Sequence, residues 1–220
     1  MNILVACEES QRVCIAFRKK GHRAFSCDIM DESGGHPEWH IKSDVVPLLN
    51  GNCFFKTNDG SENQLIGKWD MIIAFPPCTY LTNTQNWCYN IDKYGNKAIE
   101  RLKKRDCAIE FFKSIYNANC DKICIENPVG YMNTHFKKPT QIIQPWYFGD
   151  NFMKTTCLWL QGLPLLKQIY FEKPQNMKSY AYDNLYGKNG KILAWNSDEI
   201  KILRSKTFQG IANAMAEQWG

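Results

Sequence analysis

The chain has 220 residues, which suffices for one domain with a substantial core but not for two large ones. Hydrophobic residues make up 44% and charged residues 22% of it, and this balance excludes disordered and fibrous proteins. The formal net charge of +5 permits a polyanionic partner without requiring one.

Hydropathy, the first residues and the cysteines indicate the cellular compartment of the protein. No apolar run approaches the ~18 residues that a membrane span needs, so we expect no membrane partner. Met1–Glu9 turns from apolar to acidic without a basic region, which predicts a cytoplasmic protein without a secretory signal. Ten cysteines are then expected to be reduced. Four of them lie within or beside short apolar runs, as core thiols do: Cys7, Cys27, Cys124 and Cys157.

The first thirty or so residues predict a strand, a helix and a second strand. Asn2–Cys7 is a short apolar run typical of a buried strand. Val13–Phe17 supplies the apolar stretch of a helix that ends near Gly21. His22–Ile29 predicts the second strand, with Asp28 close to its end. A βαβ unit of this kind implies a parallel sheet and an α/β fold.

The middle of the chain predicts one central strand between less regular segments. His40–Val45 predicts a short strand or turn, and Asn50–Gly67, rich in Asn, Gly and Ser, predicts an exposed insertion. Trp69–Phe75 predicts the central strand, which Pro76 and Pro77 end abruptly. A long polar and aromatic loop is expected from Thr79 to about Asn96.

The remaining elements follow from periodicity. Ala98–Ala118 predicts an amphipathic helix, and Asp121–Glu126 predicts a strand. The apolar side of that helix is marked by Ile99, Leu102, Ala108, Ile109, Phe112 and Ile115. Ile142–Trp146 and Thr156–Leu160 predict an antiparallel edge, and Phe208–Trp219 predicts a closing helix. Without a repeat, linker or second boundary, one domain is expected over residues 1–220.

Four predicted strands end in distinctive polar groups, and ligands of open parallel sheets bind beyond such ends. These groups are Cys7-Glu8-Glu9, Asp28, Pro76-Pro77-Cys78 and Glu126-Asn127-Pro128. A carboxylate after the second strand suits a ribose, because it can accept hydrogen bonds from both hydroxyls. Asp28 alone is weak evidence for such a site, because ordinary surface acids are common at strand ends.

Cys78 is the strongest single candidate. Two prolines fix the backbone before it, so its thiol is expected to project at a strand end beside a loop. A half-buried structural cysteine is the alternative, but the fixed backbone and a facing acid favour a nucleophile. Glu126 ends the next predicted strand, near whatever Cys78 attacks, unless it is a solvated acid capping the Asn-Pro turn.

These residues resemble a known family. Pro76-Pro77-Cys78 and Glu126-Asn127-Pro128, in this order on successive strands, are similar to the Pro-Cys and Glu-Asn motifs of DNA cytosine-5 methyltransferases. The similarity to compact phage and prophage members extends over most of the chain, through Ala6–Ser10, His36–His40, Phe75–Thr79, Ile125–Pro128, Thr156–Leu160 and Gly210–Ala212. It implies a Rossmann-like S-adenosylmethionine-dependent methyltransferase fold, with a mostly parallel sheet and helices on both faces. It also implies that the protein is located in the cytoplasm of a bacterium or of a phage-infected host cell.

The resemblance implies methyl transfer from S-adenosylmethionine to carbon 5 of cytosine in DNA. The Cys78 thiolate would add to carbon 6, and Glu126 would hold the ring through N3 and its exocyclic amine. The cytosine would be flipped from the duplex, with part of the Thr79–Asn96 loop filling the gap. The oligomeric state is open, with a monomer favoured.

The same resemblance implies that the cofactor lies across the first three strand ends. Glu8 and Gln11 would lie near its amino-acid part, Asp28 at the ribose and Asp44 at the adenine amine. Pro76 would lie against its methionine end. The complete implied set is Cys7, Glu8, Gln11, Asp28, Ile29, Asp44 and Pro76.

The chain departs from the family at three points. Its first loop, Cys7–Val13, is not glycine-rich. Larger enzymes carry a Gln-x-Arg-x-Arg motif at the place of Met153–Thr156, which offers only Lys154. Lys154 is therefore a catalytic candidate. Its ammonium group supplies a positive charge but, unlike an arginine guanidinium, cannot form two parallel hydrogen bonds to one partner. The chain also lacks a large target-recognition domain. Residues 162–206 form either a reduced target-recognition region or an ordinary solvent-exposed loop. We therefore expect the protein to recognise a short or relaxed DNA sequence. Its candidate DNA contacts are Tyr170, Lys173, Lys178, Tyr180, Tyr182, Tyr186 and Lys188.

Other readings stay open. One alternative is a related enzyme that uses the same covalent adduct to transfer another group to a pyrimidine, or that acts on a free nucleotide. A second alternative, suggested by the missing arginines, is a catalytically impaired protein that still binds DNA or the cofactor. A metal site is not expected. In His36–His40 the acid is misplaced relative to His-Glu-x-x-His and Pro37 opposes a helix, while Cys120 and Cys124 lack a second pair.

Overall fold

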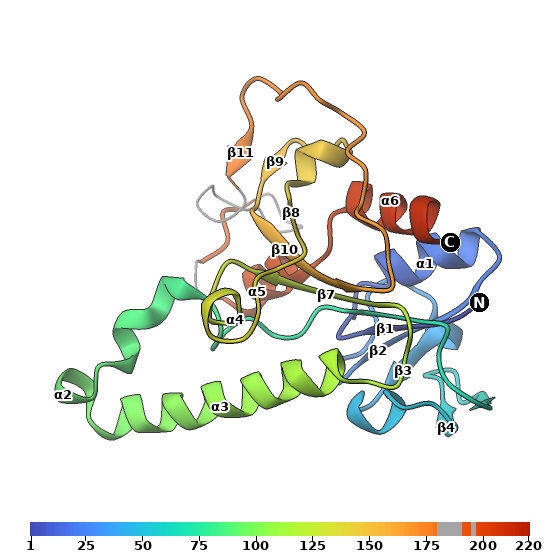
Figure 1. Cartoon of the computed structure of the whole chain (residues 1–220), viewed down its shortest axis with the longest axis horizontal. Coiled ribbons are helices and arrows are strands. Elements are labelled where there is room, and N and C mark those ends of the chain that lie inside the picture. Colours follow the sequence, from blue (N-terminus) through green and yellow to red (C-terminus); the bar gives the residue numbers. More distant parts are fainter. Residues whose placement is uncertain (180–190, 195–196) are drawn as a thin grey trace.

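The structure, a computed structural model, describes residues 1–179, 191–194 and 197–220. Within them, a seven-stranded sheet has the order β3-β2-β1-β6-β7-β10-β8 (Figure 1). Its strands in chain order are β1 (Asn2–Ala6), β2 (Arg23–Asp28), β3 (His40–Lys42), β6 (Met71–Ala74), β7 (Ile123–Pro128), β8 (Gln141–Ile143) and β10 (Thr156–Gln161). The α/β class with a mostly parallel sheet, predicted from the sequence, is confirmed.

The order of the strands creates a switch point. β3, β2, β1, β6 and β7 are parallel, whereas β10 runs antiparallel to both β7 and β8. Along the chain, the sheet grows outward from β1 to β3 and then restarts on the other side of β1 with β6. Connections leaving β1 and β6 therefore diverge, and open sheets bind ligands in the crevice that such a divergence creates.

Alternate residues of the central strands pack against helices on opposite faces of the sheet (Figure 1). On β1, Leu4 and Ala6 belong to the core that includes α3 (Asn96–Tyr116). Ile3 and Val5 belong to the opposite core. That second core contains α1 (Arg12–Lys19) and α6 (Gln209–Trp219). Burial on both faces explains why these strands are continuous apolar runs.

The shorter elements lie mostly around this sheet. Two small sheets pair β4 (Cys53–Lys56) with β5 (Glu62–Leu65) and β9 (Phe152–Met153) with β11 (Lys178–Ser179). The short helices are η1 (Pro37–Trp39), η2 (Val46–Leu48), η3 (Asn83–Tyr89), α2 (Ile91–Tyr94), α4 (Tyr131–His135), η4 (Pro145–Phe148) and α5 (Asp198–Ser205). Among the described helices, none combines the length and apolarity that a bilayer crossing requires.

Two segments expected to be irregular contain regular structure. Asn50–Gly67 is mostly exposed, as predicted, but it forms the β4–β5 hairpin, which the sequence analysis does not predict. Its strand residues alternate, so Cys53 and Phe55 are buried while Phe54 is exposed, which is the period of a half-buried strand. The segment Thr79–Asn96 is not a continuous loop either, because it contains η3 and α2.

The apolar side predicted for α3 is only partly buried. Phe112 and Ile115 are fully buried, whereas Ile99 is 40% exposed. The reason is visible in Figure 1, where the first turns of α3 extend beyond the sheet together with α2. Helical periodicity shows which residues share a side but not how far a covering sheet reaches.

The cysteines are all free, and each of the ten lies in the described part of the chain. Cys27, Cys124 and Cys157 are fully buried, as their apolar surroundings predict, and Cys7 is half-buried. Burial raises the pKa of these four thiols, which favours the neutral form that packs in a core.

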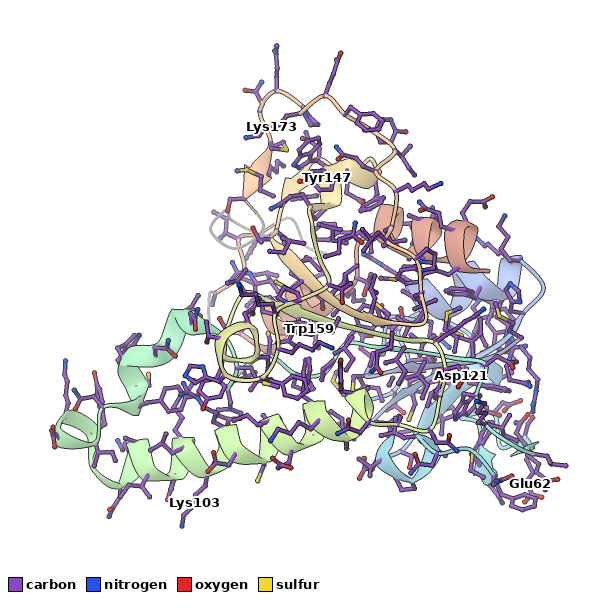
Figure 2. The ribbon with its side chains drawn as sticks, in the orientation of Figure 1. Glu62, Lys103, Asp121, Tyr147, Trp159 and Lys173 are labelled. Atoms are coloured by element: carbon purple, nitrogen blue, oxygen red, sulfur yellow. The ribbon has the colours of Figure 1, made fainter. Side chains whose placement is uncertain are left out.

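We predict that Phe112→Ala destabilises the chain by about 3–5 kcal/mol, because it removes a ring with no exposed surface from between α3 and the sheet. Phe112 meets Trp159 edge to face, with ring centroids 5.1 Å apart, and Trp159 lies between sheet and helix in Figure 2. Ile99→Ala on the same helix is the control and should cost about 0.5 kcal/mol. Urea unfolding measures both, and equal losses would contradict the burial described.

Candidate active site

The ends of β6 and β7 are tied together by one side chain. Asn127, buried near the end of β7, donates from Nδ2 to the carbonyl oxygen of Pro76 at 2.8 Å. Neither Pro76 nor Pro77 has an N–H, so a carbonyl is what this segment can offer a partner. The bond holds the backbone just before Cys78 against the residue that follows Glu126.

The residues after Cys78 are anchored to the chain that leaves β7. The N–H groups of Leu81 and Thr82 both donate to the Cys78 carbonyl at 2.9 Å, which closes a turn. Tyr131 N–H donates to Leu81 O at 2.6 Å, and Thr82 forms an isolated bridge with Gly130. Cys78 is therefore held from both sides by the segment that carries Glu126.

Cys78, Glu126 and Lys154 come within electrostatic reach of one another. Burial raises the pKa of the half-buried Cys78 thiol, the Glu126 carboxylate raises it further, and the Lys154 ammonium lowers it. Burial likewise raises the pKa of Glu126, and Lys154 again lowers it. The three residues that the sequence offers as catalytic candidates thus lie within electrostatic reach of one another, and burial shifts the pKa of both the thiol and the carboxyl group upward.

One oxygen of Glu126 lacks a partner. Oε1 is buried and accepts no hydrogen bond from any described residue. Buried polar atoms are hydrogen-bonded in the great majority of cases, and leaving one unpaired costs about 1–3 kcal/mol. An unsatisfied oxygen at the carboxyl edge of a parallel sheet suits a ligand that offers an N–H.

Glu126 also lines a small pocket of about 10 Å³. Glu126, Lys154 and Thr156 line it from the sheet, and the other lining residues come from the junction of α5 and α6: Ser205, Thr207, Phe208 and Ile211. Lys154 Nζ donates to the Arg204 carbonyl at 3.4 Å, so the same ammonium links the pocket to that junction. The sequence marks Gly210–Ala212 as a family motif but does not indicate that Ser205–Phe208 lines the site.

The junction Ser205–Phe208 also contacts the first strand ends. Arg12 Nη1 donates to Thr207 O at 2.6 Å, and Lys206 Nζ donates to Ser33 Oγ at 2.8 Å. Lys206 Nζ also lies 3.8 Å from Glu9 Oε1. The junction therefore crosses the carboxyl edge of the sheet, from the loops after β1 and β2 to the pocket at Glu126.

At the ends of β1, β2 and β3, Cys7, Asp28 and Asp44 lie close together. Burial raises the pKa of Cys7, and both carboxylates raise it further. Asp28 and Asp44 each accept one backbone N–H through Oδ1, at 3.0 Å, and among described residues Oδ2 of each accepts none. Ile29 beside them is 75% exposed. This edge therefore offers two carboxylate acceptors and an apolar surface.

The loop after β1 turns as a glycine-rich loop does, without glycine. Cys7 and Gln11 have φ of 59° and 56°, in the left-handed region that favours glycine. Each such residue costs of the order of 1 kcal/mol or more, which surrounding contacts must offset. The loop after β1 therefore adopts two glycine-type backbone conformations at residues that carry side chains.

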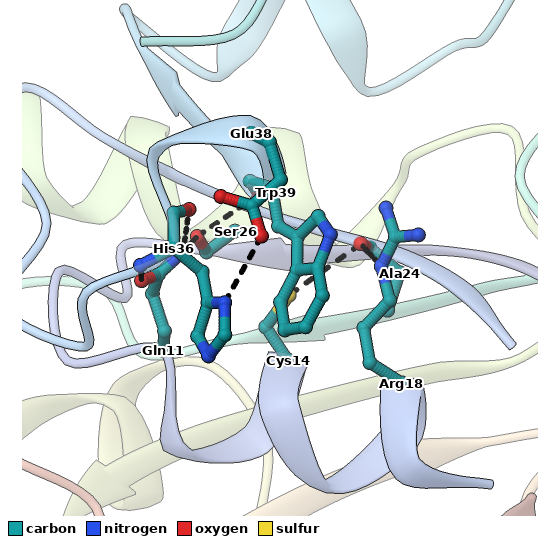
Figure 3. A network of polar contacts seen from close by, with 8 residues as sticks. All are labelled: Gln11, Cys14, Arg18, Ala24, Ser26, His36, Glu38 and Trp39. Carbon is teal, nitrogen blue, oxygen red and sulfur yellow. Dashed lines mark hydrogen bonds and ion pairs between the residues drawn. The ribbon is translucent and has the colours of Figure 1, made fainter. Parts of the chain in front are cut away.

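Glu8 and Gln11 are engaged inside the protein. The Glu8 carboxyl group accepts the N–H groups of Val13 and Cys14, at 2.7 and 3.1 Å, at the start of α1. Burial raises the pKa of Glu8 to about 8. Gln11, fully buried, accepts from His36 N–H and donates to His36 O (Figure 3). The structure does not bring these two predicted cofactor contacts to the open edge, whereas Pro76 is buried beside it.

Figure 3 shows how the segment His36–Trp39 is held. The His36 ring stacks on Trp39, with centroids 3.9 Å apart, and its Nδ1 hydrogen-bonds Glu38 Oε1 at 3.0 Å. Arg18 lies 5.1 Å from the Trp39 ring and donates to Ala24 O. These residues fasten the loop after β2 to α1. Within the described residues, no group of three potential metal ligands forms.

The predicted recognition region is described only in part. Tyr170, Lys173 and Lys178 are exposed, and Lys173 lies at the end of the molecule furthest from α3 in Figure 2. The remaining candidates lie outside the described residues: Tyr180, Tyr182, Tyr186 and Lys188. The contacts proposed for them from the sequence stay predictions.

Comparison with known proteins adds no identification. No protein-family model and no curated protein matches the chain. The case for a function therefore rests on the residues gathered at this edge of the sheet.

We predict that Gly130→Ala destabilises the chain by about 1–3 kcal/mol, because a Cβ there would lie 2.1 Å from the Leu81 carbonyl oxygen. Val129→Ala is the control, since Val129 is 43% exposed. Thermal unfolding compares the two variants. A Gly130→Ala protein as stable as the control would show that the segment after Cys78 is not docked as described.

We predict that Lys154→Met slows alkylation of Cys78 by iodoacetamide and moves the midpoint of its pH profile upward. The thiolate is the reactive form, and removal of the cation that lowers the Cys78 pKa leaves less thiolate at any given pH. Peptide mass spectrometry follows Cys78 separately from the other nine cysteines. An unchanged midpoint would contradict the electrostatic contact.

Proposed function

We propose that this protein transfers a methyl group from S-adenosylmethionine to carbon 5 of cytosine in DNA, through a covalent bond between Cys78 and carbon 6. The observation that carries the proposal is the unsatisfied Glu126 Oε1, on a side chain that lines a small pocket together with Lys154 and lies within electrostatic reach of the Cys78 thiol. The sheet order and the helices on both faces support a Rossmann-like methyltransferase fold.

Glu126 is suited to hold and polarise a cytosine ring. Its Oε1 needs a donor, and the exocyclic amine of cytosine supplies one. Burial raises the pKa of Glu126, which favours the protonated carboxyl group that can donate to N3, and protonation of N3 makes carbon 6 more electrophilic. The same carboxyl group can therefore orient the ring and activate it.

Cys78 then supplies the nucleophile. Because burial favours the neutral thiol, its proton has to pass to solvent water before the sulfur adds to carbon 6, and Lys154 stabilises the resulting thiolate. Addition makes carbon 5 enamine-like and able to take a methyl group. Solvent water then takes the carbon 5 proton. The electron pair of that C–H bond re-forms the double bond between carbons 5 and 6, and Cys78 leaves carbon 6 as a thiolate.

The residues at the ends of β1 to β3 fit S-adenosylmethionine. Asp28 and Asp44 present carboxylate oxygens suited to ribose hydroxyls and an adenine amine, and exposed Ile29 suits the face of the base. When bound, the cofactor supplies an electrophilic methyl group on its sulfonium. Glu8 and Gln11 support this site by holding the loop in shape, since both are engaged inside the protein.

Nucleoside mass spectrometry of DNA from cells that express the chain tests the proposal. We expect 5-methylcytosine with the unchanged chain and none with Cys78→Ser, because a hydroxyl is a far weaker nucleophile. A different modified cytosine would replace the methyl-transfer assignment. Unmodified DNA in both samples, together with no binding of S-adenosylmethionine by the purified chain, would overturn the proposal.

Glu126→Gln tests the role of the carboxyl group. The amide keeps the size of the side chain but cannot donate a proton to N3, so turnover should fall by about a hundredfold or more. Covalent trapping on DNA that contains 5-fluorocytosine should slow in parallel, because fluorine cannot leave as a proton does. Thermal unfolding checks that the variant is folded. Near-normal turnover would exclude the role assigned to Glu126.

A further inference from the structure

A second pocket lies outside the site described above. It has a volume of about 400 Å³ and opens between the η3–α2 segment and the first turns of α3. This volume lies in the range of small-ligand sites, which is about 300–1,000 Å³. Three of its lining residues are aromatic: Tyr80, Trp87 and Tyr94. Tyr80 follows Cys78 by two residues, so the pocket begins where the nucleophile segment ends.

The aromatic side of the pocket offers a flat apolar surface. Trp87 is 62% exposed, and its ring centroid lies 5.5 Å from that of Tyr94 at an interplanar angle of 58°. An indole that is largely exposed in a pocket can stack on a planar ligand. Stacking of nucleic-acid bases on aromatic side chains is worth about 1–3 kcal/mol per base.

The opposite side of the pocket is cationic. Lys97, Arg101 and Lys104 recur at helical spacing along one side of α3 and all line the pocket. Arg101 lies over the Tyr80 ring at 5.1 Å. Among the described residues, Lys97 and Lys104 form no hydrogen bond or ion pair, so both ammonium groups are available to an anion. Glu100 between them is an acceptor for a base amine.

The pocket keeps a defined relation to Cys78. Arg105 donates to Tyr80 O at 3.2 Å and to Asn86 Oδ1 at 3.1 Å, which fastens η3 to α3. The Arg105 guanidinium also lies 3.2 Å from the centroid of the Tyr89 ring. Together with the docking of Leu81 on Tyr131, these contacts make the pocket an extension of the catalytic segment.

We infer that this pocket binds one nucleotide of the DNA strand that carries the target cytosine, with its base stacked on Trp87 and its phosphate between Lys97 and Lys104. Aromatic residues on one side of the pocket and two cationic side chains on the other favour a ligand that combines a planar ring with an anionic group. The inference rests on the proposed function for DNA as the substrate. It assigns DNA contacts to residues within 80–104, in addition to the region 162–206 that the sequence analysis considers.

Fluorescence anisotropy with a labelled single-stranded deoxyoligonucleotide tests the inference. Trp87→Ala should weaken binding by about tenfold through lost stacking. A double variant, Lys97→Gln with Lys104→Gln, should weaken binding and reduce its dependence on salt concentration, because fewer counterions are released. The matched controls are Phe54→Ala, an aromatic residue 77% exposed on β4, and Lys103→Gln, which lies on α3 outside the pocket (Figure 2).

The controls should bind like the unchanged chain. If Trp87→Ala binds as tightly as Phe54→Ala, the pocket does not hold a base and the inference is overturned. A free deoxynucleoside monophosphate that binds as tightly as the oligonucleotide would overturn the assignment to a DNA strand. Thermal unfolding checks that Trp87→Ala remains folded.

Trapping on 5-fluorocytosine DNA separates this inference from the proposed function. Trapping by the unchanged chain together with unaltered DNA binding by Trp87→Ala would overturn the pocket assignment alone. DNA binding that depends on Trp87, without trapping by Cys78, would support the pocket and overturn the methylation proposal.

Discussion

The hydrogen bond from Asn127 to the Pro76 carbonyl is the contact on which the candidate site depends. β6 and β7 end side by side in the sheet, but the chain beyond each strand is free to diverge. The two prolines stiffen one of these segments and remove its N–H donors, so it has to be fastened through a carbonyl. Asn127 provides the donor from a buried position, and Cys78 and Glu126 are thereby kept in register.

The sequence predicts those parts of the fold where local pattern and final burial agree. Strands such as Met71–Ala74 are covered on both faces, so their apolar runs are unambiguous. The strand Cys53–Lys56 is not predictable in this way, because the surrounding Asn, Gly and Ser residues obscure a four-residue alternation. The exposure of Ile99 is not predictable either, because helical periodicity carries no information on where the supporting sheet stops.

Some residues of the candidate site are likewise predictable from the sequence, and others are not. Cys78, Glu126 and Asp28 are recognisable because they lie at or just beyond the ends of predicted strands, and parallel strands bring their carboxyl ends to one edge. Ser205–Phe208 has no such marker, since its position depends on contacts with Arg12 and Lys154 that are remote in sequence. The internal partners of Glu8 and Gln11 are likewise tertiary contacts that spacing alone does not reveal.

The position of Glu8 has a thermodynamic consequence beyond the shape of its loop. Because burial raises the pKa of Glu8 from its ordinary 4.5 to about 8, the folded chain binds a proton that the unfolded chain releases at neutral pH. The contribution of Glu8 to the free energy of unfolding is therefore largest in acid, falls as the pH rises from 4.5 to about 8, and is constant above that. Folding and proton uptake are linked through a carboxyl group that also holds the start of α1.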